Sequence, residues 1–197
     1  RDLVRSRGLG DVYKRQKVTT YHYGENNGAF RGCSNLKEVR FEEGSKKVAE
    51  YLFTNCPGLE KITIPEGIET IGNGAFAGCG NLTDIIMPGS VTTIGNSAFE
   101  STGKVKKIEI GRGTVTIADN AFKNCNELEE VSLPDTIETI GVNAFQNDQK
   151  ITGLKLPKKI KTMGYGAFGE CTGLTEIEIP KTLEKVTTYH YGAVSYT

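Results

Sequence analysis

Phenylalanine returns every 23 residues along most of this chain. The seven positions that share this phase are Phe30, Phe53, Phe76, Phe99, Phe122, Phe145 and Phe168. A period of about 20 to 50 residues is typical of solenoids, in which each unit buries its apolar side only by stacking on its neighbours. The period therefore predicts a stack of similar coils, whose equivalent side chains form continuous inward columns.

The position three residues after the phenylalanine repeats as well. Five units carry a cysteine there, namely Cys33, Cys56, Cys79, Cys125 and Cys171. Thr102 and Asp148 occupy this position in the other two units. Because all five cysteines share one phase, we expect a column of buried thiols. Disulfides need converging side chains and zinc needs closely spaced ligand pairs, so neither disulfides nor a metal site is expected.

Each unit also contains a segment whose apolar residues are two positions apart. The pairs are Val39 and Phe41, Ile62 and Ile64, Ile85 and Met87, Ile108 and Ile110, Val131 and Leu133, Leu154 and Leu156, and Ile177 and Ile179. This spacing places both members on one face of a short β-strand. A proline directly after the pair, present in five units, ends the strand because it lacks an amide donor.

The segment around each phenylalanine is expected to form one helical or 3₁₀ turn. Asn or Asp stands three positions before it at Asn27, Asn73, Asn96 and Asp119. Such a side chain can cap a helical turn. Gly or Asn stands two positions after it at Gly32, Asn55, Gly78, Asn124 and Asn147, which suits a left-handed terminating residue. The predicted fold class is an α/β repeat solenoid, with a parallel β-sheet on one face and short helical or 3₁₀ turns on the other.

The L-x-x-I-x-I segment, the A-F half-unit and the 23-residue period resemble the leucine-rich repeats of the BspA-like, or Treponema-type, family. The resemblance extends over residues 17–186, about seven repeats, and implies a right-handed leucine-rich repeat solenoid. Members of that family are mostly secreted or surface proteins of bacteria and of some mucosal protists, implicated in adhesion to host proteins and other cells. The resemblance therefore implies an extracellular or cell-surface module that binds a host matrix or surface protein; the period alone says nothing about a partner.

Composition narrows the classes of function. Lys plus Arg and Asp plus Glu each number 24, which argues against a dedicated nucleic-acid surface. No apolar run approaches the ~18 residues of a membrane-spanning helix. The only histidines, His22 and His190, lie in the string KVTTYHYG, which occurs at 17–24 and again at 185–192. We expect no catalytic residue and no cofactor, since scattered Glu and Lys residues usually form a solvated face.

Residues that alternate with the inward pairs are expected to point out of the sheet. This candidate binding face consists of Glu38, Arg40, Lys61, Thr63, Asp84, Ile86, Lys107, Glu109, Glu130, Ser132, Lys155, Glu176 and Glu178. It mixes both signs of charge and contains no aromatic residue, whereas binding hot spots favour Trp, Tyr and Arg. The pattern indicates a weak or multivalent protein-binding surface; the alternative is a structural stalk or spacer array that presents other domains.

Both ends of the chain depart from the period. Residues 1–16 have no repeat register and contain four arginines. They resemble peptides translated from sequencing adapters in metagenomic assemblies, and the alternative is a flexible basic arm. Residues 187–197 are interpreted as a truncated repeat and a tail, so that the reading frame is cut from a longer array. A stack cut between units has open strand edges and uncovered core, which predicts end-to-end self-association.

Overall fold

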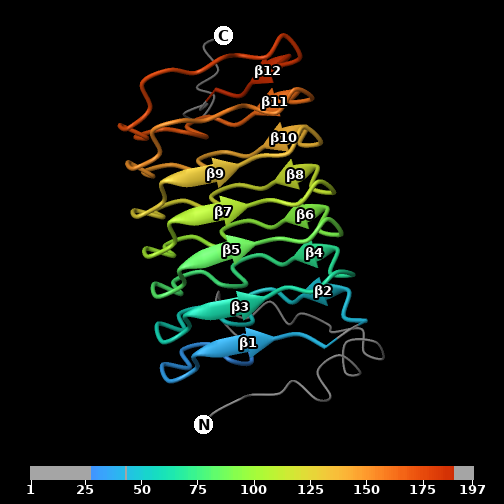
Figure 1. Cartoon of the computed structure of the whole chain (residues 1–197), viewed down its shortest axis with the longest axis vertical. Helices are drawn as coiled ribbons and strands as arrows, with labels where there is room; N and C mark the ends of the chain where they lie inside the picture. The colour runs from blue at the N-terminus through green and yellow to red at the C-terminus, as the bar shows by residue number, and fades with distance from the viewer. Residues whose placement is uncertain (1–27, 43, 189–197) are drawn as a thin grey trace, which may run out of the picture.

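The computed structural model describes residues 28–42 and 44–188, and these form a parallel-strand solenoid of about six turns (Figure 1). Each coil stacks on the preceding one along the long axis of the molecule. The expectations for residues 1–16, for nearly all of the 187–197 tail and for His22, Asn27 and His190 lie outside the described residues.

Two sets of short strands run along the stack. Three-residue strands form the surface that we call the strand face: β1 (Glu38–Arg40), β3 (Lys61–Thr63), β5 (Asp84–Ile86), β7 (Lys107–Glu109) and β9 (Glu130–Ser132). Two-residue strands form the narrow sheet: β2 (Lys47–Val48), β4 (Thr70–Ile71), β6 (Thr93–Ile94), β8 (Thr116–Ile117), β10 (Thr139–Ile140), β11 (Thr162–Met163) and β12 (Lys185–Val186). Every pair is parallel and joins residues 23 apart, as in Glu38 with Lys61 and Thr70 with Thr93. One turn of the solenoid therefore equals one sequence period.

The two sets differ in continuity. The narrow sheet is unbroken through seven strands, whereas the strand face consists of β1 with β3 and, separately, β5 with β7 and β9. The strands predicted around Leu154 and Leu156 and around Ile177 and Ile179 are absent, so that part of the prediction is wrong. Gly153 offers a physical reason, because glycine weakens a strand interior, and the following coil then has no strand to pair with.

Phenylalanine rings form one continuous stack through the core. Successive rings, from Phe30 to Phe168, lie 5.1 to 5.5 Å apart between centroids and are tilted by 4 to 15°. The four central rings, from Phe76 to Phe145, are fully buried. The column that the period predicts is thereby confirmed, with a ring spacing close to the ~4.8 Å between neighbouring strands.

The segment around each phenylalanine is not helical, which corrects the prediction of helical or 3₁₀ turns. Gly74, Phe76 and Gly78 donate their amides, each at 2.8 Å, to carbonyls of the next coil. These amides are therefore not available for helical bonds. The amide of Ala77 closes a short turn onto the carbonyl of Gly74 at 3.2 Å. Hydrogen bonds that close single turns thus alternate along the segment with hydrogen bonds between coils. The described residues contain no helix.

Left-handed residues explain why a helix cannot form here. The left-handed position two residues after the phenylalanine is confirmed in the five units with Gly or Asn there, such as Gly32 (φ 73°). Ser101 (φ 60°) and Glu170 (φ 59°), for which it was not predicted, adopt it as well. A second left-handed position, which the sequence did not predict, lies two residues before the phenylalanine: Tyr51, Gly74, Ser97, Asn120, Asn143 and Gly166. A right-handed helical turn cannot include such a residue.

The Asn and Asp residues predicted to cap helical turns bond to the next coil instead. Asn73 Oδ1 accepts from the amide of Asn96 at 2.9 Å, and Asn96 Oδ1 accepts from the amide of Asp119 at 3.2 Å. Asp119 Oδ1 accepts from the amide of Val142 at 2.7 Å. These side chains therefore stabilise contacts between coils and not the start of a helix.

The cysteine column is buried as predicted in four of its five positions; Cys33, in the first described coil, is exposed. All five thiols are free. Buried thiols donate to the phenylalanine carbonyl 26 residues earlier, as Cys79 Sγ does to Phe53 O at 3.1 Å. The column thus supplies hydrogen bonds between coils as well as packing.

Asp148 places a carboxyl group in this column. Its side chain is fully buried, and Oδ1 accepts from the amide of Cys125 at 2.7 Å, while Oδ2 has no partner. Burial raises the pKa of Asp148 to about 9, because an ion without a counter-charge is costly in an apolar interior. The carboxyl is therefore protonated at neutral pH.

Core residues become more exposed in the last described coil. Ile177, Ile179 and Val186 are 41%, 55% and 55% exposed, although their equivalents in the middle of the stack are buried. No described coil lies beyond them. End-to-end self-association through this surface stays a prediction.

Replacing Phe122 by alanine should lower the free energy of unfolding by about 3–5 kcal/mol, because it leaves a cavity between two stacked rings. Urea unfolding followed by circular dichroism measures this, and Asn126→Ala, at an exposed position of the same coil, is the control. A loss below ~1 kcal/mol for Phe122→Ala would mean that the ring is not part of a packed column.

Asp148 should make stability depend on pH. Its pKa rises from 3.8 to about 9 on folding, so the folded state holds one more proton than the unfolded state between these values. Stability that is fully present below pH 3.8 is then lost as the pH rises toward about 9, by up to ~1.4 kcal/mol per pH unit. Asp148→Cys, which restores the column residue, should flatten this dependence in urea unfolding between about pH 5 and 8. Equal slopes for both proteins would show that the carboxyl is not buried in its neutral form.

Candidate functional site

The strand face presents most of the residues that the sequence assigned to a binding surface. Ten of those thirteen residues lie on β1, β3, β5, β7 and β9, and all ten are exposed or half-buried. The residues between them, such as Val39, Ile85 and Ile108, point inward and are buried. The alternation expected of a strand with one solvated face is confirmed here.

The other three predicted residues do not belong to this sheet. Lys155, Glu176 and Glu178 are exposed, but they lie in stretches where no strand forms. They therefore extend the solvated surface beyond β9 without sharing the regular row geometry of the strand face.

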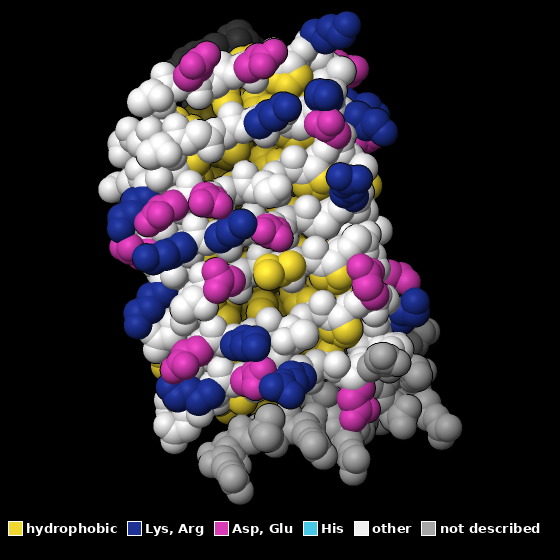
Figure 2. Space-filling model, viewed as in Figure 1, with side chains coloured by type: hydrophobic (Ala, Val, Ile, Leu, Met, Phe, Trp, Pro, Cys, Tyr) yellow, Lys and Arg dark blue, Asp and Glu magenta, His cyan; other side chains and the backbone are white. Residues whose placement is uncertain are grey.

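Most charged residues on the strand face form ion pairs. Arg40 makes two hydrogen bonds of 2.9 Å to Glu38, which also lies 3.9 Å from Lys61 Nζ. Lys107 Nζ lies 2.8 Å from Glu109 and 3.8 Å from Glu130. The hydrogen bond that Arg40 donates lowers the pKa of Glu38, and the hydrogen bond that Lys107 donates to Glu109 raises the pKa of Lys107. Figure 2 shows both signs interspersed with apolar atoms over this view, so the face has no single-sign patch to attract a polyelectrolyte.

Many ion pairs join residues 23 apart on neighbouring coils. Pairs away from the strand face include Lys37 with Glu60, Lys46 with Glu69, Lys150 with Glu127, and Lys161 with Glu138. All are solvent-exposed, so each contributes little to stability. Opposite charges one period apart are a sequence signal that could have predicted these pairs.

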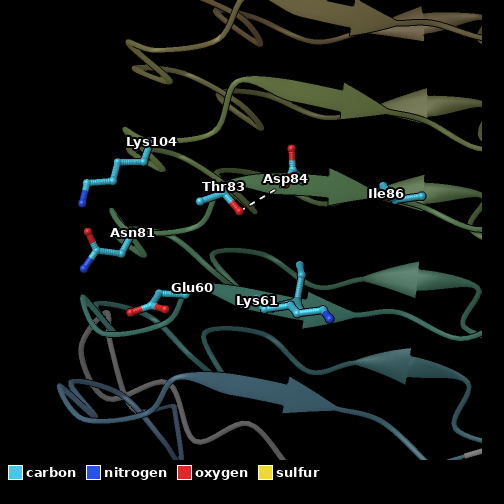
Figure 3. Close-up of a pocket in the computed structure, with 8 residues that line it drawn as sticks. Glu60, Lys61, Asn81, Thr83, Asp84, Ile86 and Lys104 are labelled. Carbon is cyan, nitrogen blue, oxygen red and sulfur yellow. Dashed lines mark hydrogen bonds between the residues drawn. The ribbon is translucent and has the colours of Figure 1, made fainter.

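The strand face is interrupted between β3 and β5. At β3 and β9 the amide of the first strand residue bonds to the preceding coil, Lys61 N to Lys37 O (3.2 Å) and Glu130 N to Lys106 O (3.1 Å). Just before β7, the amide of Lys106 bonds to Thr83 O (3.1 Å). The equivalent bond from Asp84 N to Glu60 O is missing, and β3 and β5 are not paired. The interruption forms a cleft of about 530 Å³ (Figure 3). Its lining residues are Glu60, Lys61, Ile62, Asn81, Thr83, Asp84, Ile86 and Lys104.

The cleft combines charged and apolar side chains. Glu60, Asn81 and Lys104 lie toward one end and Ile86 toward the other, with Thr83 Oγ1 donating to Asp84 Oδ2 at 3.2 Å between them (Figure 3). Ile86 is 64% exposed, the most exposed large apolar side chain among the described residues.

Sequence reasoning found only part of this cleft. It placed Lys61, Asp84 and Ile86 on the binding face and missed Glu60, Asn81, Thr83 and Lys104. The missed residues occupy turns before the strands, and no residue in the sequence marks the interruption itself.

Within residues 28–42 and 44–188, no group of three or more His, Cys, Asp and Glu side chains could hold a metal ion. The same residues contain no apolar helix of the length needed to cross a membrane.

Solved structures of bacterial leucine-rich repeat proteins are similar to this chain. A leucine-rich repeat protein from Bacteroides ovatus is 37% identical, with a TM-score of 0.73 over 79% of this chain and 40% of its own. The T. pallidum leucine-rich repeat protein is 27% identical, with a TM-score of 0.71 over 75% of this chain and 72% of its own. A leucine-rich repeat protein from Eubacterium ventriosum is 28% identical, with a TM-score of 0.70 over 79% of this chain and 45% of its own.

The chain thus spans less than half the length of the Bacteroides and Eubacterium proteins. Comparison with curated proteins gives no match. The family model described as the BspA type leucine-rich repeat region matches six copies, over residues 25–129 and 92–196. With its repeats matched across most of its length, the chain belongs to the BspA-type leucine-rich repeat family.

Proposed function

We propose that this chain is a non-enzymatic module that binds proteins through the strand face, as part of a secreted or cell-surface protein that adheres to host or partner-cell proteins. The observation that carries the proposal is the strand face itself. It is an exposed surface on which most charged side chains form ion pairs and the side chain of Ile86 is 64% exposed.

Several properties of this surface favour a protein partner. The five strands carry three basic and four acidic residues, so an association with a polyanion such as nucleic acid or an anionic membrane surface gains little. An exposed isoleucine among polar residues resembles the mixed composition of transient protein interfaces. Leucine-rich repeat arrays generally mediate protein interactions, and membership of the family supports the proposed secreted or surface location.

A structural stalk is the second candidate. The unbroken narrow sheet from β2 to β12 and the continuous phenylalanine stack support it, since both couple every coil to the next. A stalk needs no binding face, and this difference separates the two candidates experimentally.

Reversing two lysines on the strand face should weaken binding to an immobilised panel of purified extracellular-matrix and cell-surface proteins. The variant is Lys61→Glu with Lys107→Glu, and the control is Lys46→Glu with Lys161→Glu. Both doubles remove two exposed ion pairs between coils, and the first also removes the pair of Lys107 with Glu109. Exposed ion pairs contribute little to stability, so both doubles should stay folded. We expect about tenfold weaker binding for the first double in biolayer interferometry and no change for the second. Equal effects of the two doubles would place the contact elsewhere, and a panel without any binder would favour the stalk.

A further inference from the structure

We propose that a group of lysines beyond β9 binds a short acidic segment of the protein partner. The group, which we call the lysine patch, consists of Lys155, Lys158, Lys159 and Lys181, all exposed. It lies outside the five strands of the strand face, on which both signs of charge are mixed. The inference rests on the proposed function, since it takes the ligand to be part of a protein, and it specifies a second contact and its chemistry.

Charge is unevenly distributed among the coils near this end of the stack. Residues 145–167 contain five lysines, and their one carboxyl group, on Asp148, is buried and protonated at neutral pH. Residues 122–144 carry one lysine and five carboxylates, and residues 168–188 carry two lysines and four carboxylates. One strongly basic coil therefore lies between two acidic coils. At the upper right edge of Figure 2, toward the C-terminal end of the stack, Lys and Arg side chains gather.

The first turn of the patch holds two lysines side by side. Lys158 and Lys159 occupy its two central positions, and the amide of Ile160 closes it by donating to the carbonyl of Pro157 at 3.2 Å. The amide of Lys158 also donates to Oδ1 of Asp135 at 3.0 Å, which anchors the turn to the preceding coil. Pro157 and Ile160 are buried, so the backbone of the turn is fixed while both lysine side chains are exposed.

The second turn lies one coil further along and places Lys181 in the same phase as Lys158. Thr182 Oγ1 donates to the carbonyl of Lys158 at 2.9 Å, which holds the two turns together. Equivalent residues of neighbouring coils are about 4.8 Å apart in a paired sheet. Lys161 and Glu138, also one period apart, form an ion pair of 2.7 Å, whereas the two lysines repel each other. An anionic group between them would relieve this repulsion.

The patch has more positive charge than its surroundings neutralise. Within residues 28–42 and 44–188, Lys155, Lys159 and Lys181 form no ion pair, and Lys158 Nζ lies 3.7 Å from Asp135. The backbone hydrogen bond from Lys158 lowers the pKa of Asp135, and the charges of Lys158 and Lys155 act in the same direction. Both lysines are therefore close to this one carboxylate, and the four lysines of the patch share it.

The acidic coils on both sides favour a short acidic segment over a long polyanion. Asp135 borders the patch in the preceding coil, and Glu178, one period after Lys155, borders it in the next. A sulfated polysaccharide or nucleic acid that runs along the stack would meet these carboxylates and gain little. A polypeptide can confine its carboxylates to a few residues. Acidic residues two apart on an extended segment share one side, within reach of lysines on flexible stems.

Binding to the patch is expected to be weak and sensitive to salt. Each exposed pair of a lysine and a carboxylate contributes little, and salt screens exposed charges over a Debye length of ~8 Å at physiological ionic strength. A partner that also contacts the strand face would bind more tightly, because the second contact becomes intramolecular.

Fluorescence anisotropy with the whole 197-residue chain tests the patch. Two labelled peptides are compared, one with a run of glutamates between Gly-Ser flanks and one with glutamines in their place. The patch variant combines Lys155→Gln, Lys159→Gln and Lys181→Gln, which removes no ion pair and should leave the circular dichroism spectrum unchanged.

A control variant removes the same charge from other coils. It combines Lys47→Gln, Lys104→Gln and Lys106→Gln, three exposed lysines that are also outside the ion pairs of the described residues. At about 50 mM salt, we expect the glutamate peptide to bind about fivefold more weakly to the patch variant and within about twofold of the original affinity to the control. The glutamine peptide should not bind, and added salt should weaken the glutamate peptide.

The outcomes separate the inference from the proposed function. Equal loss with both variants would show general attraction to lysines and would overturn the patch as a site. Equal binding of the two peptides, or binding of neither, would overturn the acidic segment as the ligand. Tighter binding of a heparin hexasaccharide that is lost in the patch variant would assign the patch to a polysaccharide instead. The binding of intact proteins by the Lys61 and Lys107 variant still decides the proposed function by itself.

Discussion

Hydrogen bonding between successive coils is the interaction on which the rest of this structure depends. Amides on the phenylalanine side donate to the carbonyl 22 residues later, as Phe99 N does to Ala121 O at 2.8 Å, and paired strands join residues 23 apart. This constant offset places side chains of equal phase over one another. The ring stack, the thiol column and the ion pairs between coils all follow from it. On the strand face, pairing between coils is missing between β3 and β5 and beyond β9.

The period predicted the columns because it concerns many equivalent positions at once. Phe76, Ile85 and Cys79 are buried where the repeat placed them. The helical turn was wrong because its signals were local: an Asn that can cap and a Gly that can adopt a left-handed conformation fit an irregular turn equally well. Ser97, a left-handed residue with no such signature, excludes the helix, and its amide bonds to Asp119 O in the next coil. The conformational preference of a residue within one coil does not identify its hydrogen-bond partner in another coil.

The candidate site shows the same division. Alternation along a strand predicted that Lys61, Asp84 and Ile86 point outward, since it depends only on strand geometry. The cleft that brings them together with Glu60 and Lys104 depends on the spacing of two coils. The repeats have similar sequences, and no pattern in them predicts this spacing. Asp148 was noted only as an exception to the cysteine phase; its burial and its raised pKa become apparent only from what surrounds it. The structure therefore adds most information at the positions that depart from the repeat.

Scalar coupling across hydrogen bonds, measured by NMR on the isotope-labelled protein, tests this account most directly. It identifies the carbonyl to which a given amide is bonded. The account predicts coupling between the amide nitrogen of Phe99 and the carbonyl carbon of Ala121 in the next coil. Coupling to the carbonyl of Gly95 instead would mean that the segment is helical, and the bonding between coils described above would then be wrong.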